Sequence, residues 1–388
     1  MTARARFLVV THVYPRHEDD DVAPFLLRYV AELRAVGVEV TVVAPHEPGL
    51  PEQHEVDGVT VHRVRYGRDD QETLAYQGDM HQRVRTPAGF ARFLVLVRCM
   101  RQVVRARIAD FAPDVVDVQW VVPGLWFLPV DAVSMRLQVV VLGTDLALLG
   151  KLPGGAAYGR AVLRKADSVL VMSEDARLEV ESRMGRPDAV KLPPPPNVPT
   201  GPPAPPPGER RLLAIGRLVV EKGHADLLDA VARVDPAVHL TIVGTGPERE
   251  RLLELAGELD VDLDLRDPIS PSQLDAVVGA CDVFVIPSHR EGFCLVAQEA
   301  MLRQRPVVAT AVGALPEQLA PADGQQTGWL VTAKDPAALA AAITECLDPQ
   351  TDRLSIAAAG RVQAEHLLSS HRVELLDRIE QLIAPGTR

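Results

Sequence analysis

The chain has 388 residues, of which 47% are hydrophobic and 24% are charged, and its formal net charge is −11 at pH 7. This length and composition predict two globular domains and exclude a disordered or fibrous protein. The acidic balance excludes a nucleic-acid partner held through its phosphates, because that grip needs a clustered surface of lysine and arginine. The four cysteines lie far apart without a CxxC pair, so they predict neither a zinc site nor a disulfide framework.

Strand-like apolar runs alternate with helical patterns in the first half of the chain, as in βαβ units that form a parallel sheet. Gly37 ends the first helical pattern, because glycine commonly follows the last turn of a helix. The pattern predicts a Rossmann-like domain over residues 1–192. The elements expected within it are strands at 7–10, 39–43, 115–119, 138–142 and 168–172 and a helix at 28–36.

No apolar run reaches the roughly 18 residues of a membrane span. The run at 7–10 is also too short for the core of a signal peptide, which predicts a cytoplasmic protein. The segment from Phe93 to Val104 contains Arg98 and Arg101 and predicts a surface helix. Peripheral contact with anionic lipid is the alternative, and a solvated helix is favoured over it. The arginines that would make this contact are 83, 85, 92, 98, 101, 105 and 107.

A proline-rich segment separates the two halves of the chain. Ten of the fifteen residues between Pro193 and Pro207 are proline, which excludes a helix or a central strand. The segment predicts a semi-rigid linker over 193–207, with a docking site for a proline-recognising partner as the alternative. A second Rossmann-like domain is expected over 208–365, and the final helix, from about 366 to 388, is expected to be able to return to the first domain. Strands are predicted at 212–215, 239–243, 283–286 and 307–309, and helices at 335–347 and 353–383.

Two glycine-containing motifs follow predicted strands of the second domain. Arg217 and Lys222 come after Gly216, at the edge of a parallel sheet where ligands bind, so they are candidates for holding a diphosphate. Ordinary solvated charges beside a helix are the alternative. Gly244 and Gly246 permit a tight turn and a close approach of the backbone to a nucleoside, although glycine before proline also marks a plain turn.

The strongest motif spans residues 287–301, where a loop leads into a helix that is predicted to begin near Phe293. Free amides at the start of this helix, at Cys294 and Leu295, would form an anion site. Glu291 and Glu299 are separated by eight residues, or roughly 12 Å along a helix.

Such a pair of carboxylates suits a nucleotide sugar. One carboxylate would accept hydrogen bonds from the hexose and the other from the ribose. The alternative, two surface glutamates on an amphipathic helix, leaves Gly292 and Phe293 unexplained.

These motifs resemble those of the retaining glycosyltransferases of family four, which have the GT-B fold of two Rossmann-like domains facing a central cleft. The resemblance implies that Arg217 and Lys222 hold the donor diphosphate, that Glu291 contacts the transferred sugar and that Glu299 contacts the ribose. Arg217, Lys222 and Glu291 are therefore the expected catalytic residues. The other expected donor-binding residues are Gly216, Gly244, Gly246, Gly292, Phe293, Cys294 and Leu295. The matching segments are 216–223, 244–247, 291–299, 305–310 and 327–331.

The first half of the chain resembles the family less closely. The matching segments are 14–15, 24–25, 33–37, 40–45 and 143–145. Leu142 stands where relatives often have a histidine near the transferred sugar, and Cys294 stands where a glycine is common. Asp145, in the Gly-Thr-Asp element after Leu142, is expected to contact the acceptor.

The resemblance implies transfer of a hexosyl or N-acetylhexosaminyl group with retention, without a metal or cofactor, from a nucleotide sugar that is expected to be UDP-linked. The acidic run at 18–21 follows the first strand and predicts an acceptor site at Asp19, Asp20 and Asp21 for a small cationic molecule. The sequence also resembles glycosyltransferases of aminoglycoside pathways, whose acceptors include 2-deoxystreptamine. A solvated acidic turn is the alternative.

Other functions remain open at this point. One is transfer to a lipid-linked or cell-surface glycan, and another is a homologue that binds nucleotide without catalysis. A Rossmann oxidoreductase is disfavoured, because the first strand is followed by Thr11-His12-Val13-Tyr14 and not by a full glycine fingerprint.

Overall fold

The computed structural model describes residues 5–77, 80–129, 135–199, 201–203, 205–320 and 324–384. The chain divides into two compact units. The first comprises Met1–Pro194 and Arg372–Arg388, and the second comprises Pro195–His371. The sequence places the corresponding limits at 192, 207 and about 366. Residues 200 and 204 of the predicted linker and residues 385–388 of the predicted final helix lie outside the described residues.

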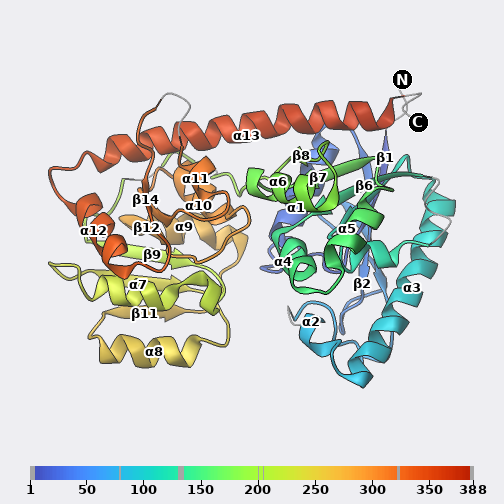
Figure 1. The fold of residues 1–388 in the computed structure, drawn as a ribbon, viewed down its shortest axis with the longest axis horizontal. Coiled ribbons are helices and arrows are strands. Elements are labelled where there is room, and N and C mark those ends of the chain that lie inside the picture. The colour runs from blue at the N-terminus through green and yellow to red at the C-terminus, as the bar shows by residue number, and fades with distance from the viewer. Residues whose placement is uncertain are drawn as a thin grey trace. The chain divides into compact units, whose positions relative to one another are not determined.

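The first unit is built on an eight-stranded sheet (Figure 1). Its strands are β1 (Arg6–Val10), β2 (Glu39–Pro45), β3 (Gln53–Val56), β4 (Val59–Val64), β5 (Val115–Gln119), β6 (Arg136–Val141), β7 (Ser168–Val171) and β8 (Val190–Lys191). Their spatial order is β3-β4-β2-β1-β5-β6-β7-β8, and each neighbouring pair is parallel except β3 and β4. After Arg6, the central strand β1 is apolar and buried because helices cover both faces of the sheet.

Helices cover the sheet of the first unit (Figure 1). They are α1 (Pro24–Ala35), α2 (Met80–Arg83), α3 (Pro87–Phe111), the 3-10 helix η1 (Gly124–Phe127), α4 (Gly143–Lys151), α5 (Gly155–Leu163) and α6 (Glu174–Met184). Thr86 caps α3 by accepting a hydrogen bond from the amide of Gly89 (3.1 Å), and Pro87 occupies the first turn. Leu96 and Met100 of this helix pack into the core against Leu8 of β1.

The second unit contains a fully parallel six-stranded sheet (Figure 1). Its strands are β9 (Arg211–Ile215), β10 (His239–Val243), β11 (Leu263–Arg266), β12 (Val283–Ile286), β13 (Val307–Thr310) and β14 (Trp329–Val331), in the order β11-β10-β9-β12-β13-β14. Its helices are η3 (Val220–Lys222), α7 (His224–Val231), α8 (Arg249–Glu258), η4 (Pro271–Gln273), α9 (Leu274–Gly279), α10 (Leu295–Leu302), α11 (Leu315–Gln318), α12 (Pro336–Leu347) and, up to His371, the long helix α13 (Arg353–Ile383). One apolar cluster holds α7, α8 and α12 against the sheet, and a second holds α9, α10 and α11. Both units are therefore Rossmann-like α/β domains, as the sequence predicts.

Residues from 372 onward in α13 belong to the first unit. There, Arg378 donates a hydrogen bond through Nε to the hydroxyl of Ser168 in β7 (2.8 Å). Arg136, at the start of β6, donates to the carbonyl oxygen of Ala384 (2.6 Å). These bonds fasten the end of the described chain to the sheet of the first unit.

The antiparallel pair β3 and β4 is absent from the sequence prediction. The two strands are joined by Asp57 and Gly58, both with positive φ (49° and 67°). Asp-Gly between two strands is a strong signal for a tight hairpin turn, because both residues tolerate positive φ. The signal is present in the sequence, but β3 is short and polar, so its apolar pattern is weak.

A buried polar cluster crosses the first unit beneath α1. The carboxylate of Asp117 in β5 accepts hydrogen bonds from Tyr29 Oη (2.8 Å), Gln119 Nε2 (3.0 Å) and Gln138 Nε2 (3.2 Å). Burial raises the pKa of Asp117 to about 6, although these three hydrogen bonds oppose the shift. Asp117 therefore takes up a proton at a higher pH in the folded protein than in the unfolded chain.

We expect the variant Asp117→Asn to become more stable, relative to the native protein, as the pH rises. A raised carboxyl pKa gives a stabilising contribution that is present below the unfolded pKa and is lost as the pH rises through about 6. Asparagine does not titrate, so the difference in unfolding free energy between variant and native protein should shift by roughly 1–3 kcal/mol between about pH 4 and pH 8. Thermal unfolding at both pH values measures this shift, with the exposed Asp70→Asn as control. A difference that does not change with pH would contradict the prediction.

Candidate functional site

Most of the predicted donor residues lie in loops at the carboxyl ends of β9, β10 and β12, the sheet edge where open α/β domains bind ligands. Leu295 and Glu299 lie in the helix α10 that follows β12. Two of these loops are joined by backbone hydrogen bonds. The amide of Gly216 donates to the carbonyl of Val243 (3.0 Å), and the amide of Leu218 donates to that of Thr245 (2.8 Å). The motifs after β9 and β10 therefore form one continuous backbone surface.

Glycines allow these loops to approach one another closely. A Cβ atom on Gly244 would overlap the carbonyl oxygen of Gly216, and one on Gly246 would overlap that of Leu218. Gly223 has a φ of +67°, and a Cβ there would overlap the carbonyl oxygen of Pro287, which follows β12. Packing of the loops thus accounts for these glycines, and the contact of Gly244 and Gly246 with a nucleoside stays a prediction.

An ion pair lies at the centre of the predicted donor site. Lys222 Nζ is 2.5 Å from Glu291 Oε1, and the Ser288 hydroxyl donates to the same oxygen (2.7 Å). The Glu291 side chain is only 7% exposed, so the lysine compensates a carboxylate that is largely removed from water. Thr310 at the end of β13 fixes this loop through a hydrogen bond from Oγ1 to the carbonyl of Ser288 (2.6 Å). Sequence reasoning did not assign Ser288 to the site, although it lies within the motif at 287–301.

Two histidines stand beside this ion pair. His224 is buried next to Lys222, and burial, with a smaller effect of the lysine charge, lowers its pKa to about 4. His224 is therefore neutral at physiological pH. His289 Nε2 lies 2.7 Å from Asp226 Oδ2, which joins the loop after β12 to α7. Sequence reasoning missed both residues, and the only signals were the positions of His224 after Lys222-Gly223 and of His289 before Glu291.

Arg217 lies in the same group of loops, directly after Gly216, and its side chain is exposed. A backbone hydrogen bond from Val219 to the Arg217 carbonyl (2.9 Å) tightens the turn that presents it. The guanidinium group is accessible to an anion at the carboxyl end of β9, as the sequence predicts for a diphosphate contact. That role stays a prediction.

The helix after Glu291 begins later than the sequence predicts. Helix α10 starts at Leu295 and not near Phe293, because Cys294 has a φ of 63° and lies in the left-handed region. The segment from Glu291 to Glu299 is therefore not one continuous helix. The distance of roughly 12 Å between them, which was based on helical rise, does not apply. Positive φ at residue 294 also explains why glycine is common at this position in the resembling family. The thiol itself is buried, and burial together with Glu291 holds the pKa of Cys294 well above its usual value.

The loop residues between Glu291 and Cys294 have structural partners. The carbonyl oxygen of Gly292 accepts a hydrogen bond from the amide of Ala314 (3.1 Å), and that of Phe293 accepts one from Gln318 Nε2. These bonds position Gly292 and Phe293 through their backbone. Whether they also contact a donor stays a prediction, as it does for Leu295.

Glu299 is held by partners different from those of Glu291. Its side chain is buried in α10, and Oε1 accepts a hydrogen bond from the backbone amide of Asn197 (2.9 Å). Arg303 Nη1 donates to the carbonyl of the same asparagine (3.2 Å), whose side-chain amide donates to Pro271 (3.0 Å). Contact between Glu299 and a ribose stays a prediction, and it requires the carboxylate to accept further hydrogen bonds beside that of Asn197.

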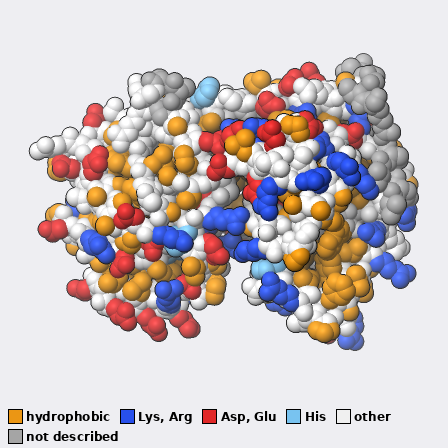
Figure 2. All heavy atoms as spheres, viewed as in Figure 1, with side chains coloured by type: hydrophobic (Ala, Val, Ile, Leu, Met, Phe, Trp, Pro, Cys, Tyr) orange, Lys and Arg blue, Asp and Glu red, His pale blue; other side chains and the backbone are white. Residues whose placement is uncertain are grey.

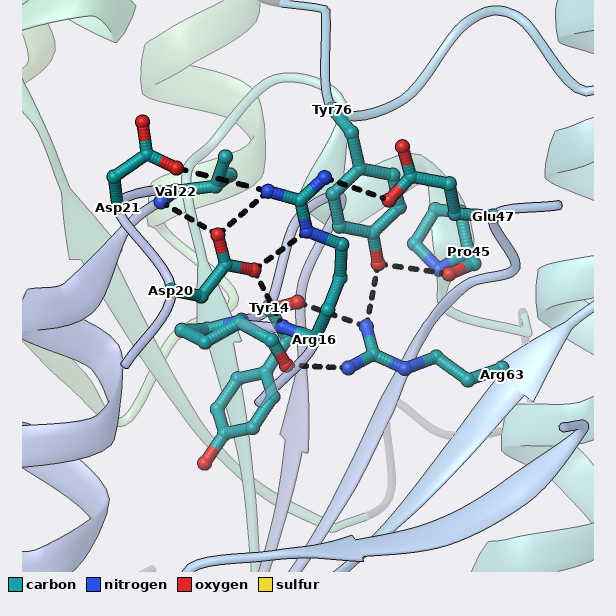
Figure 3. Close-up of polar contacts among 10 residues, drawn as sticks. Tyr14, Arg16, Asp20, Asp21, Val22, Pro45, Glu47, Arg63 and Tyr76 are labelled. Atoms are coloured by element: carbon teal, nitrogen blue, oxygen red, sulfur yellow. Dashed lines mark hydrogen bonds and ion pairs between the residues drawn. The ribbon is translucent and has the colours of Figure 1, made fainter. Parts of the chain in front are cut away.

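The acidic run after β1 is folded around Arg16 (Figure 3). The buried carboxylate of Asp20 accepts hydrogen bonds from Arg16 Nε (2.7 Å), Arg16 Nη2 (2.6 Å) and the backbone amides of Arg16 (2.7 Å) and Val22 (3.0 Å). Burial raises the pKa of this carboxyl, but the bonds from Arg16 outweigh burial and bring it to about 2. Arg16 also lies 3.6 Å from Asp21 and 3.4 Å from Glu47. Burial and pairing of Asp20 argue against the predicted contact with an acceptor, whereas Asp19 and Asp21 are exposed.

Arg63 also holds this loop in place, through hydrogen bonds to its backbone (Figure 3). Its guanidinium group donates to the carbonyl of Tyr14 (2.8 Å), to that of Pro15 and to Tyr76 Oη (2.5 Å). Tyr76 in turn donates to the carbonyl of Pro45 at the end of β2 (2.9 Å). Arg63 is a buried charge in β4 that sequence reasoning missed, because two of its partners, Tyr14 and Pro15, lie almost fifty residues away in the chain.

Asp145 has a structural role in the first unit. Its buried carboxylate accepts hydrogen bonds from the amide of Leu142 (3.0 Å), just before α4, and from the amides of Val121 (3.1 Å) and Val122 (3.1 Å), which follow β5. Burial raises the pKa of Asp145 to about 7 against the effect of these amides. With both oxygens engaged inside the fold, the geometry argues against the predicted direct contact between Asp145 and an acceptor. Across the described part of the chain, no group of three or more His, Cys, Asp or Glu side chains is placed to hold a metal ion.

Comparison with known proteins identifies both halves of the chain. Residues 22–197 match the family described as "Glycosyl transferase 4-like domain", and residues 202–363 match "Glycosyl transferases group 1". Each half of the chain is thus similar to a glycosyltransferase domain. The matched segments leave between them only residues 198–201 of the proline-rich region.

Curated relatives match part of this chain. A D-inositol 3-phosphate glycosyltransferase of Corynebacterium efficiens is 39% identical over 163 residues, which cover 39% of this chain and 37% of the relative. A glycogen synthase of Mycobacterium tuberculosis is 36% identical over 146 residues, which cover 36% of this chain and 34% of the relative. The chain thus spans little more than a third of the length of the curated relatives it matches.

Solved structures match the whole chain and show its fold. Sucrose-phosphate synthase of Thermosynechococcus elongatus superimposes with a TM-score of 0.78 at 21% identity, covering 99% of this chain and 100% of that one. An Anabaena protein solved with UDP and glucose superimposes with a TM-score of 0.69 at 16% identity, covering 97% and 100%. Together with the two domain matches, these similarities confirm the predicted GT-B fold.

Proposed function

We propose that the chain is a retaining glycosyltransferase that moves a hexosyl or N-acetylhexosaminyl group from a UDP-linked donor to a hydroxyl group. The observation that carries this proposal is the ion pair of Lys222 and Glu291 at the carboxyl ends of β9 and β12. An ammonium group suits the donor diphosphate, and a carboxylate held by Ser288 suits the hydroxyl groups of the sugar. The two glycosyltransferase domains support the same reaction class.

Departure of the diphosphate is the step that these residues assist. Glycosyl transfer passes through an oxocarbenium-like state while negative charge accumulates on the leaving group. Lys222 has three N–H donors, so it can keep its bond to Glu291 and still donate to a phosphate oxygen. Arg217 adds a second cation in the same loop. In this proposal the acceptor hydroxyl attacks on the face that the diphosphate leaves, without a metal ion or cofactor.

Slow hydrolysis of the donor tests the proposal without knowledge of the acceptor. The protein is incubated with a panel of UDP-sugars and GDP-sugars, and release of nucleoside diphosphate is measured together with the anomeric configuration of the released sugar. A retaining transferase releases UDP and a sugar of the donor's own configuration. Binding of UDP-sugars without any release would favour the alternative of a non-catalytic homologue, and an inverted sugar would overturn retention.

For the acceptor, we propose a small cyclitol that carries amino groups, such as 2-deoxystreptamine. Asp19 and Asp21, exposed in the loop after β1, support a cationic acceptor through their charge. The C. efficiens relative supports only the cyclitol ring, since its name refers to an inositol phosphate. A lipid-linked or surface glycan is the competing acceptor class.

The double variant Asp19→Asn/Asp21→Asn is expected to raise the KM for an aminocyclitol acceptor by about 3- to 10-fold, the effect of two exposed ion pairs. The KM for the donor should not change, because these residues belong to the other unit. Initial rates at varied acceptor concentration measure the effect. The matched control is Asp69→Asn/Asp70→Asn, two neighbouring exposed acids of the same unit. An unchanged acceptor KM, or a preference for inositol phosphate over the amine, would contradict a cationic acceptor.

A further inference from the structure

The charge of helix α3 and the segment before it differs sharply from that of the whole chain. Residues 80–109 contain seven arginines and neither Asp nor Glu, although the chain has a net charge of −11. Asp110, at the end of the helix, pairs with Arg107 (2.6 Å). Arg85, Arg92 and Arg98 are exposed in this segment.

Helix α3 also carries apolar side chains that the core does not use. Phe93, Leu96 and Met100 face the core, whereas Phe90 and Leu94 are each 53% exposed. Val95 is 46% exposed. Phe90 and Leu94 are four residues apart, so they lie on the same face of the helix, with Arg98 one further turn along. A helix needed only to cover the sheet would carry polar residues at these positions.

Trp126 extends this apolar surface from the neighbouring 3-10 helix. Its ring packs edge-on against Phe93 with centroids 5.4 Å apart, and it remains 37% exposed. Arg101 of α3 donates to the carbonyl of Trp126 (2.8 Å), which fixes the two elements to each other. In Figure 2, hydrophobic and basic side chains gather over the region of α2 and α3.

We propose that this surface, formed by the exposed side chains of Arg85, Phe90, Arg92, Leu94, Val95 and Arg98, binds the surface of an anionic phospholipid bilayer. Apolar residues flanked by arginines, on a helix that lies in the plane of the interface, can enter the boundary between headgroups and acyl chains. The arginines meet the lipid phosphates, each adding attraction to an anionic leaflet. Exposed phenylalanine and leucine favour a membrane over a nucleic acid, whose backbone requires only the charge. Within the described ranges, no helix is long and apolar enough to cross a bilayer, so the contact proposed is peripheral and reversible.

Vesicle sedimentation with the full chain tests this docking surface. The native protein should bind vesicles that contain about 30% phosphatidylglycerol and should bind pure phosphatidylcholine vesicles at least about tenfold more weakly. Phe90→Ser/Leu94→Ser should reduce binding to the anionic vesicles by roughly tenfold, because both apolar anchors are lost. Arg85→Glu/Arg98→Glu should abolish the preference for anionic lipid. Vesicle binding by this variant should no longer depend on the salt concentration.

Matched controls lie in the second unit. Leu253→Ser/Val362→Ser removes two exposed apolar side chains, and Arg233→Glu/Arg251→Glu reverses two exposed charges. UDP binding and circular dichroism verify that each variant is folded. The proposal is overturned if the α3 variants bind vesicles like the native protein, if the controls lose binding equally, or if duplex DNA binds α3 while vesicles do not. Because UDP release is measured separately, failure of membrane docking leaves the proposed transferase reaction intact.

Discussion

Replacement of Lys222 by alanine should lower kcat for glycosyl transfer by about 10²- to 10³-fold, the loss typical of removing one preorganised charge from a developing anion. Two effects contribute. The leaving diphosphate loses a cation in the transition state, and Glu291 loses the ammonium group 2.5 Å from its carboxylate. The hydroxyl of Ser288 and the thiol of Cys294 still donate to Glu291. Steady-state kinetics with a donor identified by hydrolysis measures the change.

A double-mutant cycle separates the loss of the cation beside Glu291 from the loss of the cation beside the diphosphate. If Lys222 acts mainly on the diphosphate, Lys222→Ala should remain strongly impaired in the Glu291→Gln background, where no carboxylate needs compensation. The exposed Lys165→Ala serves as control for removal of a lysine. A variant Lys222→Ala that retains the native kcat would contradict a role of this residue in stabilising the leaving group.

Substitution of Gly223 by alanine should destabilise the second unit by at least about 3 kcal/mol, because positive φ and a steric overlap act together. Gly223 has a φ of +67°, and a Cβ atom there would overlap the carbonyl oxygen of Pro287. The loop after β9 would have to move away from the loop after β12, and Lys222 would move with it. We therefore expect loss of UDP binding along with a lower unfolding temperature.

Gly185 provides a matched comparison. It has a φ of +68° at the end of α6, but no atom lies within 4 Å of its hypothetical Cβ. Gly185→Ala should therefore cost only about 1–2 kcal/mol, the price of a left-handed alanine. Calorimetry of the two variants separates the backbone effect from the overlap. Equal destabilisation would show that the contact with Pro287 does not constrain this site.

Buried parallel strands were the features that the sequence predicted best. The bounds of β5, β10 and β12 coincide with the predicted residues, because most residues of a strand covered on both faces are apolar. The donor loops could also be predicted, since strand, glycine and charge follow one another closely in the chain. The structure brings Lys222 and Glu291 together across the sheet edge, which a sequence pattern alone can only suggest.

Contacts between distant residues were not predictable from local patterns. Asp20 and its neighbours look alike as an acidic run, yet only Asp20 is buried against Arg16. In the sequence, Arg63 is a single charge in a strand-like segment, and only the structure shows its contacts with Tyr14 and Tyr76. The shifted start of α10 has another cause, because left-handed backbone at Cys294 is rare for a residue other than glycine.

The bonds that fasten α13 to the first unit affect the order in which this protein can be assembled on the ribosome. The first unit comprises residues from both ends of the chain, with the whole second unit synthesised in between. Until residues 372–384 emerge, Arg136 lacks its partner Ala384 and Ser168 lacks Arg378. Domains generally fold in the order of synthesis, but here the amino-terminal unit is completed last. A nascent chain stalled before residue 372 should therefore show a protease-resistant second unit beside a more sensitive first one.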